Sequence, residues 1–190
     1  KITKGNDGES INIKLELRSL ADVGLVGFPN AGKPTFLNKV SSAKPKIADY
    51  PFTTLRPHLG TIKYSDNSFV IADIPGIIEG ASDGHGLGIK FLKHISRTGI
   101  LLFFLEAFTE ISVQDQFLKL KKELGDFSEK LLEKEFYIVV TKIDLIDEKE
   151  RSKTFSAFNN NEFANVFGIS SVTGEGVQEL LDDISRKIFI

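Results

Sequence analysis

The sequence predicts an α/β fold in which a mainly parallel central sheet is flanked by helices. Three short runs, residues 21–27, 100–105 and 136–140, are mostly apolar, as strands buried on both faces of a parallel sheet require. Segments with helical periodicity follow, including 113–124 and 177–188. Alternation of apolar strands with helices is typical of α/β proteins, and 190 residues suffice for one domain of this class.

The first half of the chain supplies further elements. Apolar and polar residues alternate over 11–17, which is the period of a half-buried strand. Residues 44–58 contain three prolines, so we expect irregular structure there. The remaining predictions in this half are a loop at 27–35, a helix at 36–40, and strands at 59–64 and 68–73 joined by a turn at 65–67.

Glycine punctuates the middle of the chain. Residues 75–88 contain five glycines, and such a segment does not hold one rigid conformation cheaply. We expect a helix at 89–97, an asparagine-rich helix or loop at 155–163, and a last strand at 165–169.

The composition excludes several classes of protein and site. A formal charge of −2 argues against a surface that is basic throughout. No run of eighteen apolar residues occurs, so we expect no membrane-spanning helix. The chain has no cysteine, which excludes disulfides and cysteine-ligated metals and fits a reducing cytoplasm. We therefore expect a cytoplasmic protein that does not bind membranes. Separately, we expect a monomer.

Residues 27–35, which we name the phosphate loop, read G-F-P-N-A-G-K-P-T. They nearly match the P-loop pattern G-x-x-x-x-G-K-[ST] between a strand and a helix. In that pattern, backbone N–H groups and the helix N-terminus face an anion, and Lys33 adds a positive charge. The alternative is a simple glycine-proline turn. The expected nucleotide-binding residues of the loop are Gly27, Phe28, Pro29, Asn30, Ala31, Gly32, Lys33, Pro34 and Thr35.

Pro34 departs from the P-loop pattern, which has serine or threonine at this position. The usual hydroxyl binds magnesium, and proline has neither a hydroxyl nor a backbone N–H. Proline is tolerated in the first turn of a helix, so we expect the loop to keep its shape while losing a metal ligand. Thr35 is one residue too late to replace that hydroxyl.

Two further segments carry candidate ligands for the metal and the terminal phosphate. Thr53 or Thr54 could reach them from a loop, although two β-branched residues entering a strand are the alternative. Asp73 begins a D-x-x-G pattern at the end of an apolar strand, where it could hold magnesium through water while the Gly76 N–H meets a phosphate. Ile77 follows, so the glutamine that orients water in many GTPases is absent.

A third set of residues resembles a site that reads guanine. Residues 141–144, which we name the base loop, read T-K-I-D and resemble N-K-x-D. Asp144 could accept hydrogen bonds from guanine N1–H and the 2-amino group, which adenine does not offer, and a bidentate contact of this kind is worth about 1–3 kcal/mol. The Lys142 stem could lie along the base. Thr141 replaces asparagine, and we expect weaker bracing of the loop. A solvated turn is the alternative.

The order and spacing of these motifs resemble those of a translation-factor-class GTPase domain, and of the Obg family in particular. The matching runs are residues 21–33, 43–55, 72–81 and 86–95. The resemblance extends from residue 15 to 190, which defines the expected G domain. Residues 1–14 look like the end of a linker from the family's glycine-rich N-terminal domain. The absence of methionine, even at position 1, agrees with a fragment that lacks that domain.

The resemblance implies slow, magnesium-dependent GTP hydrolysis, binding of GTP and GDP, and a role in large-ribosomal-subunit assembly and stress signalling. It places catalytic roles on Lys33, Thr54 and Gly76, and metal ligands on Thr54, on Asp73 through water, and on the Pro34 position, where the ligand is missing. Asn30 resembles an asparagine that helps bind K⁺ in related GTPases. Further nucleotide contacts would be Phe52, Thr53, Thr54, Leu55, Arg56, Asp73, Ile74, Pro75, Gly76, Thr141, Lys142, Ile143, Asp144, Ser170, Ser171 and Val172.

Two alternatives to a slow GTPase stay open at this point. The chain could bind guanine nucleotides and hydrolyse little, because Pro34 removes a metal ligand. It could also be an ATPase of a related family, although Asp144 argues against adenine.

Overall fold

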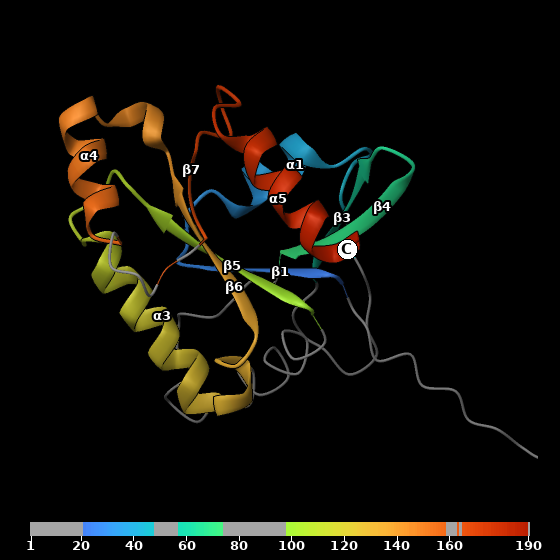
Figure 1. Cartoon of the computed structure of the whole chain (residues 1–190), viewed down its shortest axis with the longest axis horizontal. Helices are drawn as coiled ribbons and strands as arrows, with labels where there is room; N and C mark the ends of the chain where they lie inside the picture. The colour runs from blue at the N-terminus through green and yellow to red at the C-terminus, as the bar shows by residue number, and fades with distance from the viewer. Residues whose placement is uncertain (1–20, 48–56, 74–97, 159–162, 164, 190) are drawn as a thin grey trace, which may run out of the picture.

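The computed structural model describes residues 21–47, 57–73, 98–158, 163 and 165–189. Its centre is a seven-stranded sheet in the order β2-β3-β4-β1-β5-β6-β7 (Figure 1). The pairs β4–β1, β1–β5, β5–β6 and β6–β7 are parallel, whereas β2–β3 and β3–β4 are antiparallel. The strands are β1 (Val23–Gly27), β2 (Lys46–Ile47), β3 (His58–Tyr64), β4 (Asn67–Asp73), β5 (Ile100–Glu106), β6 (Glu135–Thr141) and β7 (Val166–Ile169). The predicted mainly parallel α/β fold is confirmed.

Helices cover both faces of this sheet (Figure 1). Phe36 of α1 and Leu180 of α5 are buried in one apolar cluster, and Phe117 and Leu120 of α3 are buried in the other. The helices are α1 (Lys33–Val40), α3 (Val113–Phe127), α4 (Glu148–Ser156) and α5 (Val177–Phe189), with 3₁₀ turns η1 (Glu129–Leu131) and η2 (Ile143–Leu145). Among the described residues, no helix is both long and apolar enough to cross a bilayer.

The parallel arrangement brings distant loops to one edge of the sheet. Strands β1, β4, β5, β6 and β7 all run in the same direction. The segments that follow their carboxyl ends therefore meet at one edge, which is where open α/β sheets bind ligands. The phosphate loop follows β1, Asp73 ends β4, and the base loop begins at the last residue of β6.

Three local predictions were wrong. A two-residue strand, β2, forms within 44–58, where we expected only irregular structure, because Lys46 and Ile47 pair with Leu59 and His58. Helix α1 begins at Lys33 rather than residue 36. The turn between β3 and β4 is tighter than 65–67, since Asn67 already pairs with Tyr64.

Helix α4 was not predicted, because its residues do not form an apolar stripe. No side chain of α4 is buried. The Asp147 side chain caps it by accepting a hydrogen bond from the Glu150 N–H at 2.7 Å, which is a common stabilising device at a helix N-terminus. We expected a helix or loop at 155–163, whereas the helix occupies 148–156 and a turn follows it at 157–158. The predicted strand at 11–17, the glycine-rich segment at 75–88 and the helix at 89–97 lie outside the described residues.

Candidate functional site

The phosphate loop connects the central strand β1 directly to helix α1. Gly27 ends β1 so close to its neighbour β5 that an added Cβ would lie 2.7 Å from the Phe104 carbonyl oxygen. Gly32 caps α1 with φ of 90°, and Asn30 also has a positive φ, of 65°. These left-handed residues turn the chain sharply, and glycine adopts this conformation at the least cost. The loop therefore ends at a helix N-terminus, whose free N–H groups favour an anion.

Lys33 folds back over the phosphate loop. Its Nζ donates hydrogen bonds to the carbonyl oxygens of Gly27, at 2.7 Å, and Phe28, at 2.9 Å. The side chain is buried. Burial lowers the pKa of the Lys33 ammonium, because the charged form loses solvation, and the nearby Asp73 opposes this shift. An ammonium group held at the centre of the loop can attract phosphate oxygens.

Pro34 occupies the second position of α1. The first helical backbone hydrogen bond runs from the Phe36 N–H to the Gly32 carbonyl at 2.9 Å. The missing N–H of Pro34 therefore removes no helical bond, since the first four N–H groups of a helix have no partner within it. The expectation that proline fits here is confirmed. Both Pro34 and Thr35 are exposed.

Asp73 is a buried carboxylate at the end of β4. Burial raises the pKa of this carboxyl, and Lys33 and His58 oppose the increase. Within the described part of the chain, its Oδ1 has no hydrogen-bond partner. Buried polar atoms rarely lack a partner, so this oxygen is available to a ligand. The predicted residues Phe52, Thr53, Thr54, Leu55, Arg56, Ile74, Pro75 and Gly76 lie outside the described residues.

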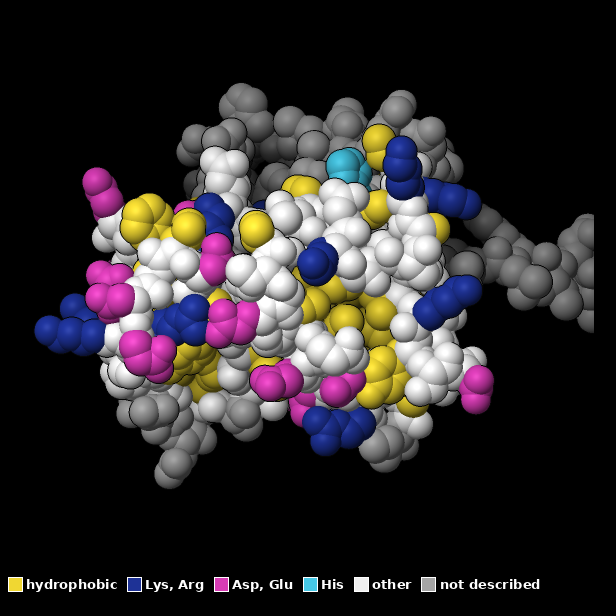
Figure 2. Space-filling view, turned by 90° about the horizontal axis from the view of Figure 1, so that it is seen from above, with side chains coloured by type: hydrophobic (Ala, Val, Ile, Leu, Met, Phe, Trp, Pro, Cys, Tyr) yellow, Lys and Arg dark blue, Asp and Glu magenta, His cyan; other side chains and the backbone are white. Residues whose placement is uncertain are grey.

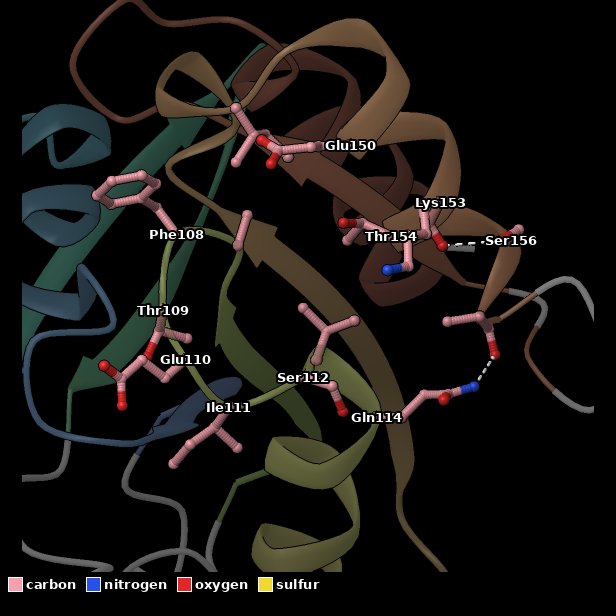
Figure 3. Close-up of a pocket in the computed structure, with 14 residues that line it drawn as sticks. Phe108, Thr109, Glu110, Ile111, Ser112, Gln114, Glu150, Lys153, Thr154 and Ser156 are labelled. Carbon is pink, nitrogen blue, oxygen red and sulfur yellow. Dashed lines mark hydrogen bonds between the residues drawn. The ribbon is translucent and has the colours of Figure 1, made fainter.

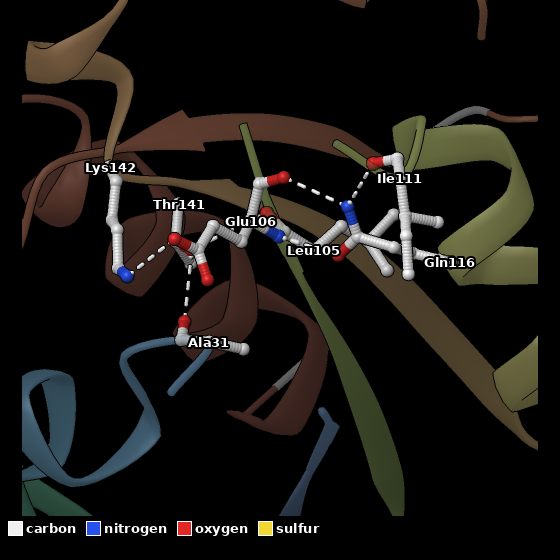
Figure 4. A network of polar contacts seen from close by, with 7 residues as sticks. All are labelled: Ala31, Leu105, Glu106, Ile111, Gln116, Thr141 and Lys142. Carbon is white, nitrogen blue, oxygen red and sulfur yellow. Dashed lines mark hydrogen bonds and ion pairs between the residues drawn. The ribbon is translucent and has the colours of Figure 1, made fainter. Parts of the chain in front are cut away.

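The base loop is tied to the phosphate loop and to β5 (Figure 4). The Thr141 hydroxyl lies 2.9 Å from the Ala31 carbonyl oxygen and 3.3 Å from that of Leu105. The Lys142 Nζ lies 2.6 Å from Glu106 Oε1. We expected threonine to brace this loop weakly, but its hydroxyl joins the base loop to the phosphate loop. Asp144, the last residue of the base loop, lies in the 3₁₀ turn η2 and is exposed to solvent.

The segment after β7, residues 170–176, lies at the same edge, and we name it the closing loop. Ser170 is fully buried, and its N–H donates to the Glu175 carbonyl at 3.0 Å. Its Oγ accepts a hydrogen bond from the Thr173 N–H at 3.1 Å. These bonds fold the loop so that Ser171 is half-buried and Val172 is 75% exposed. The tip of the closing loop is therefore accessible from solvent.

Sequence reasoning missed three side chains that support these loops. Glu106 ends β5 and pairs with Lys142. Gln116 holds the backbone of Glu106 by two hydrogen bonds of 2.9 Å. Arg151 donates to the Ile143 carbonyl at 3.0 Å and pairs with Glu175 at 2.6 Å, so it bridges the base loop and the closing loop. Glu106 could have been predicted as a site residue from its place at the end of an apolar strand, which is the pattern that identified Asp73.

A separate cavity of about 740 Å³ lies between α4 and the loop after β5 (Figure 3). Its lining residues include Phe108, Ile111 and Lys153, and none of them is a predicted site residue. Positive and negative side chains are interspersed over the face seen in Figure 2, as the near-neutral composition predicts.

The chain matches the family model described as "50S ribosome-binding GTPase" over residues 22–142. It is 54% identical to the GTPase Obg of Chloroherpeton thalassium over 182 residues, which are 95% of this chain and 53% of that protein. It is 51% identical to the GTPase Obg of Elusimicrobium minutum, over 97% of this chain and 40% of that protein. The chain thus spans about half the length, or less, of these curated relatives.

Solved structures share the fold. A variant of Aquifex aeolicus Era bound to GDP and AlF₄⁻ superposes with a TM-score of 0.65 at 22% identity, over 87% of this chain and 56% of that one. The G domain of the T. maritima FeoB iron transporter superposes with a TM-score of 0.59 at 23% identity, over 86% and 96% of the two chains. With its family match covering more than half its length, the chain belongs to the 50S ribosome-binding GTPases, as an Obg-type G domain.

Proposed function

We propose that this chain binds GTP and GDP and hydrolyses GTP slowly in a magnesium-dependent reaction. One observation carries the proposal: the phosphate loop, Asp73 and the base loop follow three parallel strands to the same edge of the sheet. A nucleotide has phosphates at one end and a base at the other, and these loops offer complementary chemistry to each end. Family membership supports the same activity.

The phosphate end combines positive charge with free donors. The N-terminus of α1 supplies backbone N–H groups, and Lys33 supplies an ammonium at the centre of the loop. Asp73 Oδ1, which has no partner among the residues that the structure describes, fits a water molecule bound to magnesium, which prefers oxygen ligands and retains several waters. Thr54 would be a direct ligand, and Gly76 would donate its N–H to the terminal phosphate. Bound magnesium would neutralise charge on the phosphates.

Pro34 makes a second function worth testing, namely nucleotide binding with little hydrolysis. This residue cannot donate a metal ligand from its position in α1. The loop nevertheless ends at a regular helix, which supports nucleotide binding without the missing hydroxyl. The two functions differ in turnover and in magnesium affinity, but not in the ability to bind GDP.

Calorimetry and turnover measurements on the chain and on Pro34→Ser would test both functions. We expect the chain to bind GDP and GTP but not ATP, and to hydrolyse GTP only with magnesium. Pro34→Ser should bind magnesium-GTP more tightly and hydrolyse it faster, whereas the control Pro45→Ser, outside the loop, should do neither. Failure of the chain to bind guanine nucleotides would refute the proposal. Binding without hydrolysis would favour the second function.

The resemblance to Obg proteins supports several wider proposals. We propose that residues 15–190 form the G domain and residues 1–14 a linker remnant, and that the whole protein acts in the cytoplasm, as a monomer, in large-ribosomal-subunit assembly and stress responses. The family description names 50S binding. Co-sedimentation with purified 50S subunits in the presence of GTP would test the ribosomal partner.

We also propose that K⁺ stimulates hydrolysis. Asn30 lies in the phosphate loop in a left-handed conformation, with its side chain exposed, so its amide oxygen is available to a cation beside the phosphates. Equal hydrolysis rates in sodium and potassium buffers would exclude this role.

A further inference from the structure

Lys142, in the middle of the base loop, has an unfavourable backbone conformation. Its φ is 59° and its ψ is 34°, which is the left-handed region. Residues with a Cβ are uncommon there, because the Cβ lies too close to the following carbonyl oxygen. Other contacts must therefore stabilise this conformation. It matters for ligand binding because it sets the direction of the Lys142 stem and of the turn that carries Asp144.

Glu106 is the side chain that holds Lys142. The Lys142 Nζ lies 2.6 Å from Glu106 Oε1, and the two side chains are only 33% and 19% exposed. Glu106 also pairs in register with Thr141, so the carboxylate projects from the strand directly beside the base loop. Because the pair is mostly shielded from water, it is stronger than an exposed surface pair.

Gln116 fixes Glu106 in turn (Figure 4). This α3 side chain is 2% exposed. Its Oε1 accepts from the Glu106 N–H, and its Nε2 donates to the carbonyl oxygens of Glu106 and Ile111, each at 2.9 Å. Both amide donors are used, so the side chain cannot rotate without leaving buried groups unpaired. The end of β5 is therefore rigid, and so is the position from which Glu106 reaches Lys142.

Asp144 explains why the position of the Lys142 ammonium matters. Asp144 is exposed, and its charge interacts with the Arg151 guanidinium without a hydrogen bond to any residue that the structure describes. Lys142 is only two residues away. Without Glu106, the ammonium would be drawn toward this carboxylate and would compete with a base for it. With Glu106 in place, the Lys142 ammonium is held 2.6 Å from Glu106 at the end of β5, so the Asp144 carboxylate stays clear of it.

We propose that Glu106 is a positioning residue for guanine nucleotide binding, which acts by holding Lys142 away from Asp144 while Gln116 fixes Glu106 itself. This inference rests on the proposed nucleotide-binding function and adds a specific determinant of affinity at the base end. The proposed role of Glu106 does not involve the phosphate loop, so changes at Glu106 should affect only the binding of ligands that carry a base.

Glu106→Gln tests the inference, because it removes the charge and keeps the size of the side chain. We expect calorimetry on the whole chain to show that the variant binds GDP about tenfold more weakly than the unaltered chain. Pyrophosphate, which has no base, should compete with GDP for the variant as well as it does for the unaltered chain. Glu135→Gln is a matched control. It breaks another Glu–Lys pair, with Lys187 at 3.2 Å, at the opposite end of β6, and should leave GDP binding unchanged.

A second comparison tests whether Lys142 transmits the effect. In a Lys142→Met background, Glu106→Gln should cause no further loss of GDP affinity. In the original chain, Glu106→Asp, which keeps the charge, should lose less GDP affinity than Glu106→Gln. Unchanged GDP binding by Glu106→Gln, an equal loss in both backgrounds, or an equal loss of pyrophosphate binding would overturn the inference. If the unaltered chain binds pyrophosphate but not GDP, the proposed function itself fails.

Discussion

The hydroxyl of Thr141 donates a hydrogen bond to the carbonyl oxygen of Ala31, 2.9 Å away. The two residues are 110 positions apart in the chain, and each belongs to a different loop of the candidate site. Thr141 is buried at the end of β6, and Ala31 is buried in the phosphate loop. A single side-chain bond thus joins the phosphate loop to the base loop.

Thr141→Val should weaken both folding and binding. Valine keeps the shape of threonine but leaves the buried Ala31 carbonyl without this donor, which costs about 1–3 kcal/mol in the free energy of unfolding. We also expect GDP to bind more weakly, because the two loops are no longer held together. Urea denaturation and calorimetry would measure the two effects. Thr141→Ser, which keeps the hydroxyl, should stay close to the original chain, and equal losses in both variants would contradict the role of this bond.

Asp144→Asn should change the preferred base. An amide offers one acceptor and one donor, which suits the N1–H and 2-oxo groups of xanthine rather than the two donors of guanine. We expect a loss of about 1–3 kcal/mol in GDP binding, together with a gain in xanthosine diphosphate binding. Calorimetry with both nucleotides would measure the change. The control is Asp147→Asn, three residues later, since asparagine caps a helix as well as aspartate. A variant of Asp144 that keeps its guanine preference would contradict base reading by this residue.

Arg151→Lys should loosen the base loop and the closing loop from each other. Lysine cannot form both the bond to the Ile143 carbonyl and the two-pronged pair with Glu175. Since both charged side chains are partly exposed, we expect little loss of stability. We expect the variant to release GDP faster than the original chain, as measured by stopped-flow fluorescence. The difference in release rate between the two chains should be smaller at high salt. Arg186→Lys, on α5, is the matched control, and equal release rates in all three chains would contradict the coupling.

Glu123→Gln should stabilise the fold at neutral pH but not in acid. Burial raises the pKa of the Glu123 carboxyl from its ordinary value, and the nearby Asp126 adds to the increase. A carboxyl with a raised pKa contributes stability that is present below its unfolded pKa and is lost as pH rises through its folded pKa. The variant should therefore unfold less readily at pH 7 and match the original chain near pH 4. Urea denaturation at both values would measure this, and a difference that persists in acid would contradict the assignment.

The parts of the site that follow from short, local patterns were predictable from sequence. The phosphate loop connects an apolar strand to a helix, and this local order placed its residues at the end of a buried strand. Asp73 and the base loop also follow apolar strands, and parallel strands bring their carboxyl ends to one edge. The predicted helix began too late, at residue 36, so Pro34 was placed in the loop although it lies in the first turn of α1.

The supporting side chains were not predictable, because their partners lie far away in the sequence. Gln116 looks like an ordinary polar residue of an amphipathic helix until the fold places it against Glu106. Arg151 belongs to a charged helix that has no apolar stripe. Because this helix shows no hydrophobic periodicity, the sequence pattern did not predict it. Strand β2 depends on pairing with β3 rather than on its own residues.

The alternation along β5 constrains how this strand can change in length. Ile100, Leu102 and Phe104 belong to one apolar cluster, and Leu101, Phe103 and Leu105 belong to the other. Deleting one residue would exchange the two sets, so that every side chain beyond the deletion would point to the wrong face of the sheet. A single deletion would therefore place the wrong side chains in both apolar clusters. It would also turn Glu106 away from Lys142. Length changes in this strand are therefore tolerable only in steps of two residues, and related chains should differ in their loops instead.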